Sequence, residues 1–249
     1  MGGAGYIFTG ENCANVMHNS SLINLLLLER VVEENLQASL RIFYSSSACI
    51  YPEYNQTDPE NPICSEDSAY PAAPDSEYGW EKLFSERLYL AFQKNYGITV
   101  RIARFHNIFG PLSVFEGGKE KAPAAICRKV LRYKSKQTDK IEIWGDGSQT
   151  RSFLFVDDCV DGILALTESN HMGPFNIGSE EMVSIRKLVD IFCEVAKVDS
   201  PVIEAVSGPV GVRGRNSDNS KIREAINWDA STSLKKGCQR LMEWMEGVI

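Results

Sequence analysis

Apolar and polar positions change their spacing several times in the first half of the chain. Residues 21–35 carry apolar side chains on nearly every face of the first turns, which predicts a helix buried against a sheet and a partner. Residues 40–45 alternate as in a short strand, residues 77–95 have helical spacing, and residues 98–103 predict a second strand. Strand, helix and strand in this order predict a right-handed crossover in a parallel sheet.

Shorter elements alternate in the second half. The spacing predicts helices over residues 123–133, 157–167 and 184–196, strands over 141–144 and near Val202, and two closing helices. The glycines on either side of Asp146 predict a tight turn, and Asp157 is expected to cap its helix. We therefore predict an α/β fold. Residues 1–111 form a parallel-sheet domain, residues 112–249 form a smaller α/β lobe, and a ligand binds between them.

Composition narrows the class of protein. The 249 residues suffice for one substantial domain, and 33 acidic against 26 basic residues disfavour nucleic acids and anionic membranes as partners. Seven cysteines without metal-like spacing indicate reduced thiols and no metal site. The apolar run at 22–28 is too short to span a bilayer and has no cleavage site, so we expect a cytoplasmic protein.

Hydroxyl groups follow the first predicted strand, where open α/β sheets bind ligands. Ser46 and Ser47 stand at that strand's carboxyl end, and Tyr78 and Lys82 share one face of the next helix. A neighbouring ammonium lowers the pKa of a phenol, which suits Tyr78 to act as a general base. Tyr-x-x-x-Lys alone is common on solvated helix faces. The preceding serines favour the site of a short-chain dehydrogenase/reductase.

Two further side chains have the chemistry for proton transfer. An isolated cysteine is usually a small core residue, but Cys49 follows the strand end closely enough to face a ligand, where a thiol exchanges protons with a carbon acid. Lys121 is either an ordinary surface lysine or part of a shaped loop. The Gly117-Gly118 pair before it and the Ala-Pro helix start after it favour the shaped loop.

Six segments distributed over almost the whole chain carry a resemblance. They are SSACIYPE (46–53), YGWEK (78–82), RFHNIFGP (104–111), GGKEKAPAA (117–125), WGDGSQTRSF (144–153) and GVRGRNSD (211–218). Together they resemble one enzyme family, the GDP-mannose 3,5-epimerases, which are extended short-chain dehydrogenases/reductases of the plant ascorbate route. The contexts of Cys49 and Lys121 are specific to that family among its relatives.

This resemblance implies a three-part reaction on GDP-mannose. Tyr78, helped by Lys82 and Ser47, takes the C4 hydroxyl proton while NAD accepts the C4 hydride. Cys49 and Lys121 then act as an acid/base pair at C3 and C5. Hydride returns to C4 and gives GDP-L-galactose, with GDP-L-gulose as a side product.

The resemblance also implies the binding residues and the partner. Residues 1–111 would be part of an NAD-binding Rossmann domain, with Ser46, Tyr78 and Lys82 on the cofactor. Asn107 would orient the sugar, and Arg213 and Arg215 would bind the diphosphate. The first helix and the Tyr78 helix would form the interface of a homodimer or of a dimer with a full-length homologue. The remaining substrate contacts would come from Gly5, Ser47, Glu120, Lys121, Gln149 and Arg151.

The glycines at the start of the chain invite comparison with a phosphate-binding turn. No strand precedes residues 1–5, Phe8 occupies the third glycine position, and only about forty residues separate them from Ser46, too few for a nucleotide-binding half. They match better a Met-Gly-Gly-x-Gly loop beside the sugar. On that alignment the chain is truncated at its N-terminus and stops short of the family's C-terminal tail. The strand at 40–45 would then have an unpaired edge.

Three interpretations follow for activity. The chain is an epimerase that is truncated or rearranged, or it is a non-catalytic paralogue that binds a sugar nucleotide or a full-length subunit. A related NAD-dependent nucleotide-sugar 4-epimerase or 4,6-dehydratase is the third, and Cys49 and Lys121 disfavour it.

Overall fold

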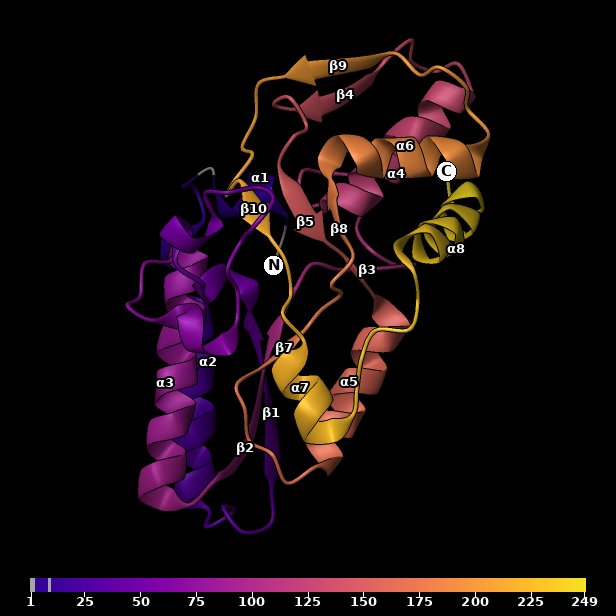
Figure 1. The fold of residues 1–249 in the computed structure, drawn as a ribbon. Helices are drawn as coiled ribbons and strands as arrows, with labels where there is room; N and C mark the ends of the chain where they lie inside the picture. The colour runs from indigo at the N-terminus through magenta and orange to yellow at the C-terminus, as the bar shows by residue number, and fades with distance from the viewer. Residues whose placement is uncertain (1–2, 9) are drawn as a thin grey trace.

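A three-stranded parallel sheet lies at the centre of the fold (Figure 1). The computed structural model describes residues 3–8 and 10–249. Strands β1 (Arg41–Ser47), β2 (Thr99–Phe105) and β7 (Phe175–Ile177) pair in the order β1-β2-β7, all parallel. Their carboxyl ends therefore meet at one edge, and the register sets Ser47 opposite Phe105. The α/β class and the parallel crossover are confirmed.

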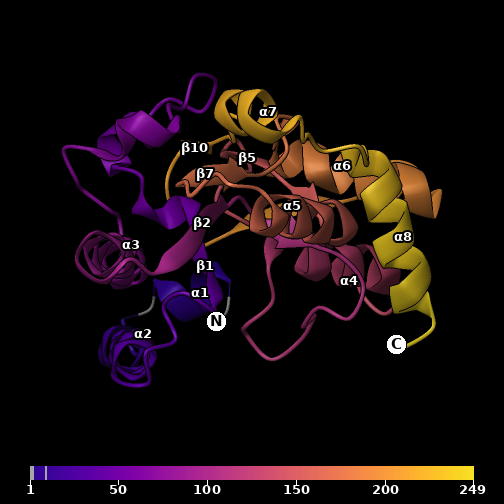
Figure 2. The ribbon, with the colours of Figure 1, turned by 90° about the horizontal axis from the view of Figure 1, so that it is seen from below.

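Helices cover both faces of this sheet (Figure 2). On one face, α2 (Cys13–Glu33) packs against α3 (Glu77–Tyr96) over a core of aliphatic and tyrosine side chains. The other face carries α5 (Val156–Glu168) and α7 (Ser220–Ile226). The Ser76 hydroxyl accepts from Gly79 N at the start of α3, and Gly97, with φ 71°, ends the helix in the left-handed region.

A second lobe packs beside the carboxyl edge of the sheet. Its core lies among α4 (Ala122–Lys134), α6 (Ile185–Ala196) and α8 (Leu234–Glu246). Three small sheets complete it, in the orders β4-β9, β10-β5-β8 and β3-β6. Their strands are β3 (Ile108–Phe109), β4 (Ile141–Trp144), β5 (Thr150–Ser152), β6 (Leu154–Phe155), β8 (Met182–Ser184), β9 (Ile203–Val206) and β10 (Gly214–Arg215). The short elements are α1 (Ala4–Ile7) and the 3₁₀ helices η1 (Ala48–Ile50), η2 (Glu53–Gln56) and η3 (Glu66–Ala69).

Most predicted elements agree with the structure to within two residues, and two differences are informative. Helix α2 begins at Cys13, eight residues before the predicted start. The predicted cap at Asp157 is wrong, because Phe155 is the N-cap residue and Asp157 lies inside the first turn, paired with Arg240. The boundary at residue 111 stays a prediction, although β7 from beyond it supplies the third strand of the sheet.

Strand β1 lies at the end of the sheet. It pairs with β2, and no other strand among residues 3–8 and 10–249 pairs with its second edge, as the sequence predicted. Helix α2 beside it exposes Ile23 and Leu26, with 66% and 55% of their surfaces accessible. None of the helices in the described ranges is long and apolar enough to cross a membrane.

A buried ion pair joins the two main strands to helix α3. Arg104 on β2 donates from Nε and Nη2 to the two Glu86 oxygens, at 3.0 and 2.8 Å, and both side chains are 2% exposed. The Ser46 hydroxyl on β1 donates to the same carboxylate. Arg104 Nη1 reaches the Tyr51 hydroxyl at 3.3 Å and the Glu66 carbonyl at 2.9 Å. The network fixes the ends of β1 and β2 relative to α3.

Replacing Arg104 by Met tests this network. The change leaves the Glu86 carboxylate buried without its partner, so we expect a loss of about 3–5 kcal/mol in the free energy of unfolding, measured in urea. Arg87→Met, on the exposed side of the same helix, is the control and should change it by less than about 0.5 kcal/mol. Equal effects of the two changes would contradict the assignment.

Candidate active site

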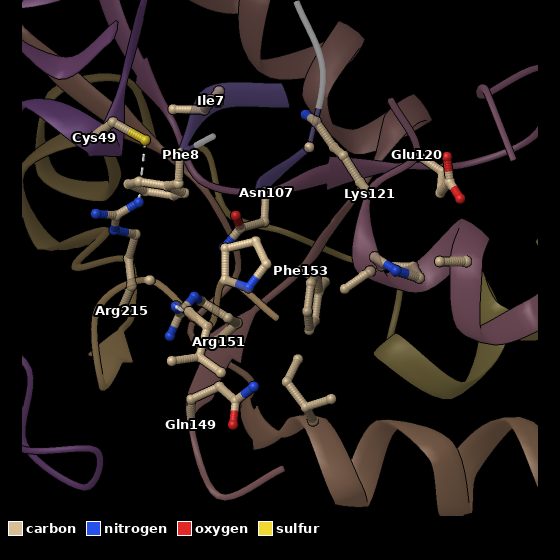
Figure 3. A pocket seen from close by; sticks show the side chains of 18 of the residues that line it. Ile7, Phe8, Cys49, Asn107, Glu120, Lys121, Gln149, Arg151, Phe153 and Arg215 are labelled. Carbon is tan, nitrogen blue, oxygen red and sulfur yellow. Dashed lines mark hydrogen bonds between the residues drawn. The ribbon is translucent and has the colours of Figure 1, made fainter. Parts of the chain in front are cut away.

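A cavity of about 530 Å³ opens at the carboxyl ends of β1 and β2, between the sheet and the second lobe (Figure 3). Most residues proposed from the sequence line it, although they come from segments more than 150 residues apart. The residues brought together are Ser46, Ser47, Cys49, Tyr78, Lys82, Asn107, Glu120, Lys121, Gln149, Arg151 and Arg215. Gly5 and Arg213 are the predicted site residues that do not line it.

The turn after β1 presents Cys49 to the cavity. Ser47 caps the 3₁₀ helix η1, and its Oγ accepts from Cys49 N at 3.2 Å. Helix α3 approaches this turn so closely that a Cβ on Gly79 would lie 2.2 Å from the Cys49 carbonyl oxygen. Glycine at position 79 therefore allows the neighbouring Tyr78 to lie beside the cysteine.

Tyr78 and Lys82 lie close together, but their electrostatics differ from the prediction. Lys82 Nζ lies 5.8 Å from the centre of the Tyr78 ring and donates to the Ser45 carbonyl at 2.9 Å. Burial raises the pKa of Tyr78 above its usual value, and nearby Cys49 and Glu81 add to this, whereas the hydrogen bond with Ser47 and the charge of Arg215 oppose it. The sequence predicts a lowered pKa through Lys82, but in the protein alone the net shift is upward, because desolvation of the phenolate is the largest contribution.

Lys121 reaches the cavity from the start of α4. Gly3 N donates to the Lys119 carbonyl at 2.9 Å, and a Cβ on Gly3 would lie 2.2 Å from the Glu120 carbonyl oxygen. This close approach shapes the loop, and Lys121, the N-cap residue of α4, faces the cavity. Protein atoms around the ammonium remove part of its hydration, which lowers the pKa of Lys121 below its usual value.

Glu120 and Asn107 each keep one oxygen unused. Glu120 Oε1 accepts from Arg128 Nη2 at 3.1 Å, while its buried Oε2 has no hydrogen-bond partner among the described residues. Asn107 adopts a positive φ of 43° and donates from Nδ2 to the Ser152 carbonyl at 2.9 Å. Its Oδ1 has no hydrogen-bond partner in the same part of the chain. Both side chains line the cavity with an oxygen available for a hydroxyl group of a ligand.

Gln149 and Arg151 belong to the far wall. Gln149 donates to the Trp144 carbonyl at 3.1 Å, and its buried Oε1 lacks a partner within the described ranges. Arg151 Nη2 donates to the carbonyls of Val210 and Val212, at 3.1 and 2.7 Å. Burial, with repulsion from Arg215, lowers the pKa of Arg151 to about 10. Arg151 therefore holds residues 210–212 against the cavity.

Arg215 lies in strand β10 and Arg213 directly precedes it, and the two arginines differ in burial and in hydrogen-bond partners. Arg215 is 6% exposed and donates to Cys49 Sγ at 3.1 Å and to Gln56 Oε1 at 2.5 Å (Figure 3). Arg213 is exposed and donates to Ser148 Oγ at 3.0 Å. Gly5 lies in α1 and does not line the cavity; a Cβ at this position would lie 3.3 Å from the ring of Trp144, which does line it. Met1 and Gly2 of the predicted glycine loop lie outside the described residues.

Several lining residues escaped the sequence analysis. Asp75 is the most notable, because its carboxylate is buried next to Arg215 at 3.7 Å. It stands in the Pro-rich segment before α3, where no spacing marks it as functional. The apolar wall was also missed and includes Ile7, Phe8, Ile108, Ile143, Trp144, Phe153, Val210 and Val212. No cluster of metal-ligating side chains occurs in residues 3–8 and 10–249.

A family model described as the NAD dependent epimerase/dehydratase family matches residues 4–178. The chain belongs to this family. A GDP-mannose 3,5-epimerase from Arabidopsis thaliana is 44% identical over 246 residues, which are 99% of this chain and 63% of that protein. One from Oryza sativa subsp. japonica matches equally well, with 62% of its length covered. The chain thus spans less than two thirds of these relatives.

Solved structures of epimerases share the fold. The UDP-glucose 4-epimerase of Thermotoga maritima, solved with UDP-glucose, superposes with a TM-score of 0.75 at 24% identity, covering 96% of this chain and 75% of that one. At this identity the likeness concerns the fold, which is the Rossmann type of parallel sheet. It agrees with the α/β class predicted from the sequence.

The family depends on NAD, and one end of this cavity suits part of that cofactor. The Lys82 ammonium uses one of its three donors on Ser45, and the Tyr78 phenol lies beside it, so this pair has donors for the hydroxyls of a nicotinamide ribose. Among residues 3–8 and 10–249, no glycine turn links a strand of the β1-β2-β7 sheet directly to a helix, which is where a pyrophosphate would bind. The described residues therefore fit the nicotinamide riboside end of NAD.

Reaction with an alkylating reagent tests whether Cys49 is accessible to solvent while the core cysteines are not. Cys49 and Cys13 are partly exposed, whereas five cysteines are buried, and burial raises the pKa of Cys127 and Cys159 to about 12. Iodoacetamide should therefore modify Cys49 and Cys13 in the native protein, and the others after unfolding. Mass spectrometry of tryptic peptides reads each site, with Cys13→Ser as the control that removes one label. Native labelling of the buried five would contradict the described packing.

Proposed function

We propose that this protein is an NAD-dependent nucleotide-sugar epimerase that converts GDP-D-mannose to GDP-L-galactose and GDP-L-gulose. The observation that carries the proposal is the position of Cys49 and Lys121 on opposite sides of one cavity (Figure 3). Tyr78 and Lys82 line the same cavity. The relatives from Arabidopsis and rice support the same substrate.

Epimerisation at two carbons needs two proton carriers. A carbon next to a ketone loses its proton to a base on one face of the ring and regains one from an acid on the other. Cys49 and Lys121 approach the cavity from β1 and α4, which places a thiol and an amine on opposing walls. Lys121 keeps solvent exposure, but the protein atoms around its ammonium desolvate it in part and lower its pKa, so its neutral, proton-accepting form is more populated at a given pH than that of an ordinary lysine.

The ketone at C4 requires oxidation first. When bound beside Tyr78 and Lys82, NAD would supply the hydride acceptor for this oxidation and the hydride donor that restores the C4 hydroxyl. Tyr78 receives the hydroxyl proton, Ser47 holds the phenol oxygen, and Lys82 supplies a positive charge nearby. The raised pKa of Tyr78 in the protein alone means that substrate and cofactor charges must help to stabilise the phenolate.

Polar groups along the cavity suit a nucleotide diphosphate sugar. Asn107 and Glu120 offer oxygens to sugar hydroxyls, and Gln149 offers a buried oxygen on the far wall. Trp144 and Phe8 provide apolar surface beside them for a base. Arg151 adds positive charge between these two ends.

A binding-only role is the second candidate, and one observation favours it. Tyr78 and Lys82 suit a nicotinamide ribose, but among the described residues no glycine turn joins a strand of the central sheet to a helix for the pyrophosphate. Calorimetry with NAD separates the two roles. Heat of binding is expected for the enzyme, and an absence of binding at millimolar NAD would exclude catalysis by this chain alone.

Solvent exchange tests the proton carriers. With NAD and GDP-mannose in deuterated water, the wild type should place deuterium at C3 and C5, measured by NMR. Cys49→Ala and Lys121→Met should each reduce this exchange by about 10²–10⁴-fold, because each removes a proton carrier. Oxidation at C4 should stay measurable in both variants.

Matched controls come from the same segments. Lys119→Met changes a lysine two residues from Lys121 that does not line the cavity, and Cys13→Ala changes the other accessible thiol. Both controls should exchange at the wild-type rate. Undiminished exchange in Cys49→Ala would rule out the role given to the thiol.

We also propose a homodimer, formed through α2 and α3, with a full-length homologue as the other candidate partner. Leu22, Ile23, Leu26 and Leu27 on α2 and Trp80 and Phe84 on α3 are all more than 40% exposed. Two neighbouring helices with apolar outer faces suit a four-helix contact with a second copy. Seven free cysteines favour a reducing compartment, so we place the enzyme in the cytoplasm and, by its resemblance, in the ascorbate route.

Sedimentation tests the dimer. The wild type should sediment as a dimer, and Leu26→Glu should shift it to the monomer because the charge would be buried in the interface. Leu112→Glu is the control, since Leu112 is 85% exposed on a loop outside both helices, and it should remain dimeric. A monomeric wild type across the accessible concentration range would exclude this interface.

A further inference from the structure

The loop over residues 110–121 joins β3 to α4 and carries Lys121 at its end. Gly117 and Gly118 in this loop have φ values of 87° and 82°, in the left-handed region that favours glycine. A Cβ on either glycine would meet no atom of the described residues within 4 Å. No packing therefore restrains this pair, and contacts on either side of it determine where Glu120 and Lys121 lie.

Main-chain and aromatic contacts hold parts of the loop. The Lys119 carbonyl accepts from Gly3 N at 2.9 Å, and the Phe115 ring lies edge-on to Trp244 of α8 with 5.8 Å between the ring centres. Neither contact involves the side chain of Glu120. The direction of that carboxylate is set from α4 instead.

Arg128 on α4 contacts carboxylates on both sides of the glycine pair. Its Nη2 donates to Glu120 Oε1 at 3.1 Å, and these two side chains are 15% and 16% exposed. Its Nη1 lies 3.7 Å from Glu116 Oε1. Glu120 and Lys121 are neighbours on the cavity wall that faces Cys49 (Figure 3). One guanidinium thus holds the segment that supplies both of them.

A second arginine contacts the loop more weakly. Arg132, one turn further along α4, pairs with Glu116, and both side chains are more than a third exposed. Ion pairs in contact with water contribute little to stability. A charged hydrogen bond between two mostly buried groups is stronger, and removing one partner leaves the other charge uncompensated. Arg128 is therefore the residue on which the loop depends, and Arg132 is a matched control.

We propose that Arg128 is a positioning residue that orients the Glu120 carboxylate through Oε1 and holds residues 117–121 against α4, which keeps Lys121 at the cavity wall. Its effect on turnover rests on the proposed function, in which Lys121 carries a proton and Glu120 binds the sugar. Arg128 itself lines the cavity and has a buried Nε without a partner in the described part of the chain. Direct contact with a ligand is therefore the competing role.

Cleavage by trypsin after Lys119 tests the loop without a ligand. Lys119 is exposed, and cleavage of the folded chain requires local opening of the loop. Arg128→Gln should increase the cleavage rate at this bond by about tenfold, because the loop loses a charged hydrogen bond. Mass spectrometry reads the rate, and dividing it by the rate for the same variant unfolded in urea removes the sequence preference of the protease.

Arg132→Gln removes the same charge from the same helix and should change the cleavage rate by less than about twofold. Equal increases in the two variants, or no increase in Arg128→Gln, would overturn the proposal. Urea unfolding shows whether each variant is folded. If Arg128→Gln does not fold, Glu120→Ala breaks the same contact from the loop side. It should raise cleavage after Lys119 by a similar factor, and an unchanged rate would again overturn the proposal.

Calorimetry separates positioning from direct contact with a ligand. Arg128→Gln should weaken the Kd for GDP-mannose about tenfold and leave the Kd for GDP within about twofold, because Glu120 is proposed to bind the sugar. In a Glu120→Ala background, the same change should weaken GDP-mannose binding by less than about twofold, since no carboxylate remains to be oriented. A tenfold loss in that background, or for GDP, would assign Arg128 to the ligand and overturn the proposal.

Arg128→Lys keeps the positive charge and should bind GDP-mannose within about threefold of the wild type. A loss equal to that of Arg128→Gln would contradict the ion pair. If the wild type binds neither GDP-mannose nor GDP, the proposed function fails. The cleavage rates after Lys119 then decide the positioning role on their own.

Discussion

The site depends on the buried ion pair between Arg104 and Glu86. Because the Glu86 carboxylate also accepts from Ser46, it joins the end of β1 to α3, and Arg104 joins both to the end of β2. Cys49 lies in the turn that follows Ser46, and Tyr78 lies two turns before Glu86 on the same helix. Buried charges tolerate little displacement, so this pair sets the position of the thiol relative to the phenol.

The cavity beside the Arg104–Glu86 pair is lined by several cationic side chains, and desolvating them lowers the free energy of unfolding. Desolvation lowers the pKa of Lys121 and Lys82 below the value of an unfolded chain. At pH values between the lowered pKa and the ordinary lysine pKa, the unfolded state binds more protons than the folded state. These two lysines therefore reduce the free energy of unfolding at neutral pH. That free energy rises again as the pH increases through the interval. The same desolvation makes a neutral amine available to the chemistry proposed for Lys121.

Site residues were predictable from the sequence where local secondary structure alone fixes the position of the side chain. Cys49 and Tyr78 were found because a strand end and an i,i+4 helix face position side chains whatever surrounds them. The raised pKa of Tyr78 depends on burial by distant segments, which spacing does not report. Asp75 was missed for the same reason, since its buried position beside Arg215 arises only where β10 approaches the segment before α3.

The groups proposed to react at C4 and the donors proposed for the nicotinamide ribose share two elements. Ser47 ends β1, and Tyr78 and Lys82 lie on α3. Hydrogen bonds to one ribose contribute about 1 kcal/mol each, far less than a full dinucleotide site supplies. Affinity for NAD, more than the arrangement of the reacting groups, therefore governs whether the proposed reaction proceeds.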